Sequence, residues 1–426
     1  MTIFWFRRDL RLFDNTALHY ALENSKEVQP IFIFDSEIID ELENDDPRVN
    51  FLYDELFKIN IQLNNLKSSI KIYKGKPLKI ISELISSTKI TSLYTNRDYE
   101  PYAIKRDNEI ANLLKDNQIS FHTFKDQVIF EENEVVKNDG LPYTVFTPFK
   151  NKWLQRFNDN KLVINKNSDN SNYKNSNHPF PSREDIGLTK SNIIVPNFDI
   201  AMVSNYDKTR NFPGLDATSK IGPHLRFGTL SIRQIVEKVI PLNEIYLSEL
   251  IWREFFMQIL WHFPKVVHQN FRSKYDGVKW RNNEDDFNKW CKGETGYPFV
   301  DAGMRELNKT GFMHNRVRMI TAGFLCKHLL IDWRWGEAYF AKKLLDYELS
   351  SNNGNWQWSA GTGCDAAPYF RVFNPTEQIK KFDKQHYYIK KWVKDINEMT
   401  YPQPIIDHKF ARNRALETYK SGLAKI

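Results

Sequence analysis

The stretch NNGNWQW at residues 352–358 decides how the fold of this chain is interpreted. Two tryptophans flank one glutamine among asparagine and glycine, residues that favour turns and close approach of the backbone. If the stretch is helical, positions two apart do not share a face, so the indoles of Trp356 and Trp358 should point in different directions. One could face a cofactor or core and the other an outer pocket. A pair of packed core tryptophans near a loop is the alternative.

Short apolar segments alternate with helical patterns in the N-terminal part of the chain. Strands are expected at residues 3–6, 30–34, 70–73, 92–94 and 120–124, and helices at residues 15–23, 48–66, 78–87 and 103–115. This alternation predicts a doubly wound parallel sheet, whose ligands lie at the carboxyl ends of the strands. No G-x-G-x-x-G or Walker A pattern occurs there, which argues against a standard dinucleotide or nucleoside triphosphate site.

The pattern becomes helical from about Asn205 onward. The clearest helices are expected at residues 248–261, 298–307, 316–330 and 337–349. Asn158–Asn177 is rich in Asn, Ser and Lys and nearly free of apolar residues, which indicates an exposed connector. We therefore expect an α/β domain at residues 1–130, a connector at 131–204 and an all-α domain at 205–426.

Composition argues against several classes of protein. No run of 18 apolar residues occurs and no basic region precedes a long apolar one at the N-terminus, so neither a membrane span nor a signal peptide is expected. Cys291, Cys326 and Cys364 form no C-x-x-C pair and cannot supply a four-cysteine metal or iron–sulfur site. A reducing cytoplasm without structural disulfides is expected, and no metal.

The net charge of +7 is unevenly distributed along the chain. Residues 201–426 carry a net +10, whereas the remainder carries −3. A basic excess in one domain is the expected footprint of polyanion binding. Charge alone, however, favours the alternative of a basic surface with no partner.

Several segments match a known family in the family's order. They are Glu249–Phe255, Thr295–Pro298, Met313–Met319, Asn352–Trp358 and Asp365–Arg371, preceded at the N-terminus by Phe4–Leu12. From Ile3 to about Arg414 the chain resembles the DNA photolyase and cryptochrome family, and within it the class I cyclobutane pyrimidine dimer photolyases. The resemblance implies an antenna-type α/β domain followed by a helical domain that binds FAD and DNA.

The resemblance also implies which residues hold FAD. Thr218–Gly222 offers hydroxyls, a cation and backbone amides for a pyrophosphate, with Lys220 and Gly222 where the family often has Arg and Ser. Arg318 would pair with Asp346 along the flavin, and the Asn352 amide would face flavin N5 and tune its electronics. The expected FAD contacts are Tyr206, Thr218, Ser219, Lys220, Ile221, Gly222, Tyr246, Glu249, Arg253, Asn315, Arg318, Asp346, Glu348 and Asn352.

Three tryptophans match the family's electron-hopping chain from the protein surface to the flavin. They are Trp280, Trp333 and Trp356, which without the resemblance would be taken for core residues. Together with Glu249 and Asn352 they make up the expected catalytic set.

A lesion in duplex DNA must be flipped out to meet the flavin, and aromatic side chains can then stack on its bases. The resemblance assigns Trp252 and Trp358 as walls, and Glu249 to the pyrimidine carbonyls. Guanidinium groups suit the flanking phosphates. The expected DNA contacts are Arg210, Trp252, Asn315, Arg316, Met319, Trp358 and Arg371.

The lesion type is predicted from two positions. The (6-4) photolyases carry His where this chain has Asn315 and Met319, and neither an amide nor a thioether can serve as an acid. Repair of cyclobutane pyrimidine dimers in UV-damaged DNA is therefore expected. The alternatives are a (6-4) photolyase, a cryptochrome photosensor without repair activity, and a helical DNA-binding protein without photochemistry. Asn352 and the short end after Arg414 favour repair.

A second, antenna chromophore stays open between a folate, a deazaflavin, another flavin and none. Folate-binding members carry an Asn-Glu pair where this chain has Tyr102 and Ala103, and a Cys-Lys pair where it has Val267 and His268. This argues against folate binding in that mode. A monomer is expected.

Overall fold

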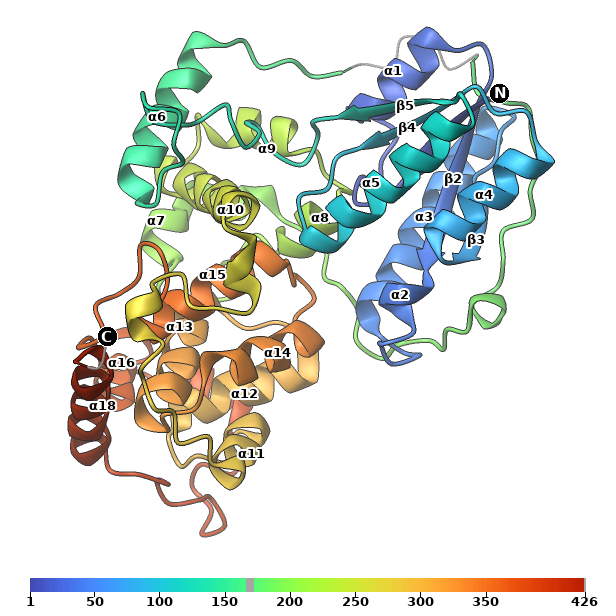
Figure 1. Ribbon diagram of the computed structural model, residues 1–426. Coiled ribbons are helices and arrows are strands. Elements are labelled where there is room, and N and C mark those ends of the chain that lie inside the picture. Colours follow the sequence, from blue (N-terminus) through green and yellow to red (C-terminus); the bar gives the residue numbers. More distant parts are fainter. Residues whose placement is uncertain (166–171, 425–426) are drawn as a thin grey trace. The chain divides into compact units, whose positions relative to one another are not determined.

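The computed structural model describes residues 1–165 and 172–424, which form two compact units (Figure 1). The first comprises the described residues of Met1–Val135, Trp153–Phe198 and Lys220–Pro241. The second comprises those of Val136–Lys152, Asp199–Ser219 and Leu242–Ile426. The expected connector at 131–204 is thus shared between the units, and residues 166–171 of the expected exposed stretch lie outside the described residues.

The first unit is built on a five-stranded sheet of order β3-β2-β1-β4-β5 in which every pair is parallel. Its strands are β1 (Thr2–Phe6), β2 (Val28–Asp35), β3 (Lys71–Gly75), β4 (Ser92–Asn96) and β5 (Ser120–Phe124). Its helices are α1 (Thr16–Asn24), α2 (Ser36–Ile39), α3 (Pro47–Asn65), α4 (Pro77–Ser87), α5 (Pro101–Asp116), α8 (Gly222–Phe227) and α9 (Ile232–Val239), with a 3₁₀ turn η1 (Glu184–Ile186). The expected strands and helices of the α/β part are confirmed.

The two faces of the sheet carry separate apolar cores, because successive side chains of a strand point to opposite faces. Phe4 and Phe6 of β1 pack with residues of α1 and α3, whereas Ile3 and Trp5 pack with residues of α4 and α5. The sheet is therefore covered on both faces, which confirms the doubly wound architecture.

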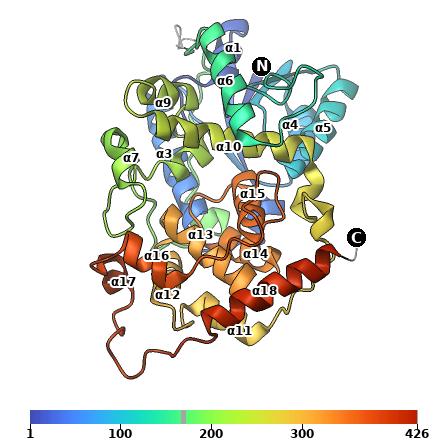
Figure 2. The ribbon, with the colours of Figure 1, turned by 90° about the vertical axis from the view of Figure 1, so that its left-hand side faces the viewer.

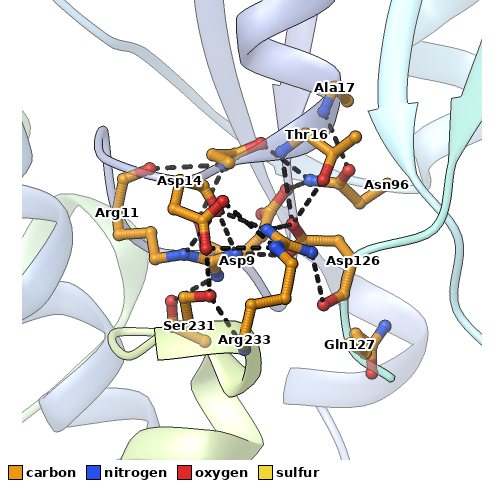
Figure 3. Close-up of polar contacts among 12 residues, drawn as sticks. Asp9, Arg11, Asp14, Thr16, Ala17, Asn96, Asp126, Gln127, Ser231 and Arg233 are labelled. Carbon is orange, nitrogen blue, oxygen red and sulfur yellow. Dashed lines mark hydrogen bonds and ion pairs between the residues drawn. The ribbon is translucent and has the colours of Figure 1, made fainter. Parts of the chain in front are cut away.

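A buried network of charges ties the loop after β1 to two other segments of the first unit (Figure 3). Asp126 accepts from Arg11 Nη2 at 2.6 Å and from Arg233 Nη2 at 2.8 Å. Arg233 Nε also donates to Asp14 Oδ2 at 3.0 Å, and Asp14 accepts from the Ser231 hydroxyl. Burial raises the pKa of the Asp126 carboxyl, but Arg11 and Arg233 outweigh it and lower that pKa to about 2.

The second unit is helical. Its α-helices are α7 (Tyr206–Thr209), α10 (Glu244–His262), α11 (Glu284–Lys292), α12 (Pro298–Thr310), α13 (Asn315–Gly323), α14 (Trp333–Lys343), α15 (Leu349–Ala360), α16 (Pro375–Phe382), α17 (Tyr387–Trp392) and α18 (His408–Leu423). Shorter turns are η2 (Ile200–Asn205), η3 (Pro264–Val267), η4 (Ser273–Tyr275) and η5 (Phe324–His328), and α6 (Phe146–Asp159) contains the division between the units. The helix α15 packs against α10, α13 and α14, and Figure 2 shows it alongside α13 and α14.

Two of the helices expected in this unit end earlier than predicted. The helix expected at 337–349 begins at Trp333 and ends at Lys343, because Leu344 and Leu345 turn into the core and Leu345 N donates to Gly311 O at 2.9 Å. The helix expected at 316–330 is α-helical only to Gly323, after which residues 324–328 form a π-turn. In both places the apolar pattern continues beyond the end of the helix.

The whole stretch at 352–358 lies inside α15, although Asn and Gly favour turns. The expected close approach is present instead between side chain and helix. A Cβ on Gly354 would lie 2.2 Å from Cδ1 of Phe256 on α10. Gly354 is therefore required by packing and not by a turn.

The part of the chain that the structure describes contains no helix long and apolar enough to cross a membrane. Cys291, Cys326 and Cys364 are all buried and unbridged.

Candidate functional site

Asn352 on α15 is buried and held by one residue of α14. Its Nδ2 donates to Glu337 Oε1 at 2.8 Å and to the Glu337 backbone oxygen at 3.1 Å. Burial raises the pKa of the Glu337 carboxyl, and the bond from Asn352 opposes this effect. Within the described residues Asn352 Oδ1 makes no hydrogen bond, so this oxygen can accept from a bound group. Sequence analysis missed Glu337, which no motif or periodicity relates to Asn352.

Two arginines of the neighbouring helices pair with the segment that leads into α15. Arg318 of α13 donates to Asp346 Oδ2 at 2.9 Å, which confirms the expected pair. Arg253 of α10 contacts Glu348 Oε1 at 3.2 Å. The helices α10, α13 and α14 thus each bring a polar side chain to α15 or to the segment that leads into it.

A second polar group lies where the segment before residue 220 meets α10. The Ser219 and Tyr246 hydroxyls are 2.7 Å apart, and the rings of Tyr206 and Tyr246 meet edge to face at 4.9 Å. Burial raises the pKa of Tyr246 to about 12. The expected phosphate segment is divided, since Thr218 and Ser219 belong to the helical unit and Lys220–Gly222 to the first. The phosphate role of these residues stays a prediction.

Buried polar atoms without partners occur in both units, and three of those in the described residues lie on these segments. Thr218 Oγ1, Asp346 Oδ1 and Ser350 Oγ are buried and make no hydrogen bond in the described chain. Folded proteins rarely leave buried polar groups unpaired, so each such atom needs an explanation. A polar ligand bound among these helices would supply the missing partners.

Some of the residues expected to contact DNA are paired with another side chain, and others are exposed. Glu249 Oε1 lies 2.8 Å from Arg210 Nη1, while the Arg210 guanidinium lies 5.2 Å from the centre of the Tyr206 ring. Burial raises the pKa of the Glu249 carboxyl, and Arg210 opposes this effect. In contrast, Asn315 and Arg371 are exposed, which fits an external partner.

The two expected aromatic walls differ in their surroundings. Trp252 stacks on Phe146 with ring centres 3.7 Å apart and planes within 8°, so one face of its indole is covered. Trp358 is half-buried and makes no ring contact within the described chain. Sequence analysis missed Phe146, which is far from Trp252 along the chain.

The three tryptophans of the expected electron-hopping chain make no ring contact with one another in the described residues. Trp356 contacts Phe340 at 4.9 Å and Trp290 at 6.1 Å, whereas Trp280 contacts Tyr419 at 5.9 Å. Trp333 is fully buried and donates from Nε1 to Asn270 Oδ1 at 2.9 Å. Electron hopping along these residues stays a prediction.

Comparison with known proteins gives the family. A family model described as DNA photolyase matches residues 2–167, and one described as the FAD binding domain of DNA photolyase matches residues 246–400. A curated relative from Escherichia coli is 35% identical, with 98% of each chain covered. This chain belongs to the DNA photolyase family. The Escherichia coli relative is named deoxyribodipyrimidine photo-lyase, as is a Vibrio cholerae relative that is 34% identical over 99% of this chain and 100% of its own.

Solved photolyase structures share the fold over nearly the whole length. A class III photolyase from Agrobacterium tumefaciens has a TM-score of 0.88 at 31% identity and covers 100% of this chain and 98% of its own. An archaeal photolyase from Sulfolobus tokodaii, solved with two FAD molecules, has a TM-score of 0.85 at 33% identity, covering 98% and 99%. A Synechocystis cryptochrome, 24% identical, shares the fold.

The helical unit of this photolyase-family chain suits FAD. The dinucleotide carries ring N–H groups, hydroxyls and phosphate oxygens that can pair with the unpaired atoms of Thr218, Asp346 and Ser350 and with Asn352 Oδ1. The family model for FAD binding covers three of these four residues.

Proposed function

We propose that this protein uses light to repair cyclobutane pyrimidine dimers in DNA. When bound, reduced FAD would supply an electron that opens the cyclobutane ring and returns afterwards, so no net redox change results. The family membership and the names of the relatives support the photochemistry, and Asn315 and Met319 support the choice of lesion.

The observation that carries the choice of lesion is the chemistry of α13. Asn315 and Met319 present an amide and a thioether, and neither can donate a proton as an acid. The adjacent His314 is buried, and its Nδ1 accepts from Arg316 N at 3.1 Å to cap the helix. A cyclobutane dimer split by an electron needs no proton donor, whereas a (6-4) lesion needs one.

The contacts between side chains described above would keep the groups that bind the flavin in position. Glu337 orients Asn352 so that its Oδ1 can accept from an N–H at the flavin edge. The Arg318–Asp346 pair leaves one carboxylate oxygen unpaired, which would be available to the flavin, and the Arg253–Glu348 pair holds the start of α15. The remaining expected FAD contacts of the helical unit, which the same proposal covers, are Tyr206, Thr218, Ser219, Tyr246, Glu249 and Asn315.

Flipping the lesion out of the duplex costs about a few kcal/mol, and stacking on an aromatic ring returns roughly 1–3 kcal/mol per base. Trp252 and Trp358, which are both half-buried, would supply this stacking. Glu249, whose pKa is raised by burial, would bond the pyrimidine edge while Arg210 holds it in place.

Tyr102, which stands where folate-binding relatives carry Asn, is engaged within the first unit. Its hydroxyl lies 2.6 Å from Asp35 Oδ2 and 3.1 Å from Glu37 Oε2, and burial raises its pKa. These bonds support the expectation that no folate is held here in the Asn-Glu mode.

The test compares two lesions in the same oligonucleotide, one with a cyclobutane thymine dimer and one with a (6-4) photoproduct. The reduced protein is illuminated with each, and restored thymines are quantified by chromatography. The proposal expects restoration of the cyclobutane dimer alone. Restoration of the (6-4) lesion instead would overturn the choice of lesion, and repair of neither with reduced flavin bound would favour a photosensor.

A further inference from the structure

Arg210 and Asn211, adjacent residues that follow α7, each hold a side chain on a different helix. Arg210 Nη1 lies 2.8 Å from Glu249 Oε1 on α10. Asn211 Oδ1 accepts a hydrogen bond from Arg316 Nη2 on α13. Two side chains expected to contact DNA are therefore fixed by one short segment of the helical unit.

Among the described residues, the contacts of Arg316 are with uncharged groups. Its guanidinium carbon lies 4.3 Å from the centre of the Phe382 ring, and its Nη1 lies 3.8 Å from the sulfur of Met319. Its Nε is buried and makes no hydrogen bond. Arg316 forms no ion pair with any described residue, whereas Arg253 and Arg318 each pair with a carboxylate.

This arrangement keeps a positive charge in place at an electrostatic cost. Burial and the nearby Arg210 both lower the pKa of Arg316, because each disfavours the charged form. An aromatic face and a neutral amide hold the guanidinium without neutralising it. An incoming anion would therefore meet a cation that is oriented in advance and lacks a counter-ion, which is the condition for a strong charge-assisted hydrogen bond.

We propose that Asn211 is a positioning residue that orients the Arg316 guanidinium without cancelling its charge, so that Arg316 binds a DNA backbone phosphate. Arg210 holds Glu249 instead. This inference rests on the proposed function, because the phosphate is taken to be one that flanks the lesion. It gives separate roles to two arginines that the sequence alone groups together as phosphate contacts.

Substitutions at Asn211 distinguish a charge role from a merely structural one. Asn211→Asp keeps the shape and the hydrogen bond but adds a carboxylate that pairs with Arg316. Asn211→Ala removes the bond and leaves the arginine charge uncompensated. If Asn211 has only a structural role, Asn211→Asp should behave like the wild type and Asn211→Ala should be the more damaging change. If Asn211 matters because it is uncharged, Asn211→Asp should weaken DNA binding more than Asn211→Ala.

The measurement is equilibrium binding in the dark to a duplex with one cyclobutane thymine dimer, from 50 to 200 mM salt. Each phosphate contact contributes about 0.9 to the slope of log affinity against log salt. We expect Asn211→Asp to lower that slope by about one and the affinity by roughly tenfold. Asn211→Ala should keep the slope and bind only a few-fold more weakly. Asn205→Asp adds the same charge at an exposed position nearby and controls for a general charge effect.

A second pair of variants keeps the test decisive. Arg316→Gln should lower the slope by about one in the wild-type background and change nothing further in the Asn211→Asp background. Equal effects of Arg316→Gln in both backgrounds, or a wild-type slope for Asn211→Asp, would overturn the role of Asn211. Unchanged flavin absorbance of each variant checks that it is folded.

Failure of this inference can be told from failure of the proposed function. Light-driven repair by the wild type combined with an unchanged Asn211→Asp slope would remove the role of Asn211 and keep the enzyme. Absence of repair combined with the expected slope change would keep the phosphate contact of Arg316 and remove the repair activity.

Discussion

Two groups of buried polar side chains in this chain differ in how completely they are paired. In the α/β unit, Asp14 and Asp126 are bonded by Arg11 and Arg233, so the network is complete without any ligand. In the helical unit, Asp346 Oδ1, Ser350 Oγ and Thr218 Oγ1 are buried and make no hydrogen bond with a described residue. Because buried polar groups are usually paired, we interpret the first arrangement as structural and propose that the second receives a polar ligand.

The largest effect on stability is expected from breaking the buried network of Asp14, Asp126, Arg11 and Arg233. Asp126→Asn removes one partner and leaves two buried arginines under-compensated, so the free energy of unfolding should fall by about 3–5 kcal/mol. Denaturant unfolding monitored by circular dichroism measures this. A loss under about 1 kcal/mol would contradict the structural role of the network.

The same network predicts a dependence on pH. Arg11 and Arg233 outweigh burial and lower the pKa of Asp126 to about 2, below the value near 3.9 of an unfolded aspartate. The stabilisation is therefore fully present above about pH 4 and is lost as pH falls toward 2. The difference in unfolding free energy between the wild type and Asp126→Asn should shrink over that range. A constant difference would show that the carboxylate charge is not what stabilises.

A smaller effect is expected from overfilling the helical unit. A Cβ on Gly336 would lie 2.1 Å from Cη2 of Trp356, so Gly336→Ala should cost about 1–3 kcal/mol and weaken FAD retention. Gly323→Ala is the matched control, since its nearest neighbouring atom lies at 3.7 Å. Thermal unfolding and the flavin-to-protein ratio measure both variants. Equal behaviour of the two alanines would contradict the packing of Trp356 against α14.

A change in the flavin absorption spectrum is expected from a substitution at Asn352 that leaves the protein folded. Asn352→Asp puts a second carboxyl within 2.8 Å of Glu337 Oε1, and like charges at that distance raise the pKa of the pair. FAD should be retained while the absorption spectrum that develops on photoreduction changes. Asn355→Asp, on the exposed face of the same helix, should leave that spectrum as it is. An unchanged spectrum for Asn352→Asp would remove this residue from the flavin edge.

The smallest effect is expected at the surface. Arg371 is exposed and forms no ion pair with a described residue, so Arg371→Ala should lower the salt slope of DNA binding by about one phosphate contact. Stability should be unchanged. A wild-type slope would remove Arg371 from the phosphate contacts.

Sequence analysis predicted the fold well where local periodicity decides the structure. The five strands follow from alternating and apolar runs, and β1 is buried along its whole length as such a run predicts. It failed where tertiary packing overrides local preference. The end of α14 at Lys343 depends on Leu344 and Leu345 entering the core, and Gly354 fits against Phe256 inside a helix.

The candidate site shows the same division. The Arg318–Asp346 pair could be predicted, because the resemblance implied it and the residue chemistry fitted. Glu337, Asn211 and Phe146 could not be predicted, because each acts through a contact with a residue distant in sequence and belongs to no motif.

The most direct test of repair is blue illumination of the anaerobically reduced protein with an oligonucleotide that carries one thymine cyclobutane dimer. The restored thymines are quantified against a dark control. The account predicts restoration in the light and none in the dark. No restoration with reduced FAD bound would contradict repair as the function, although the chain would remain a member of the DNA photolyase family.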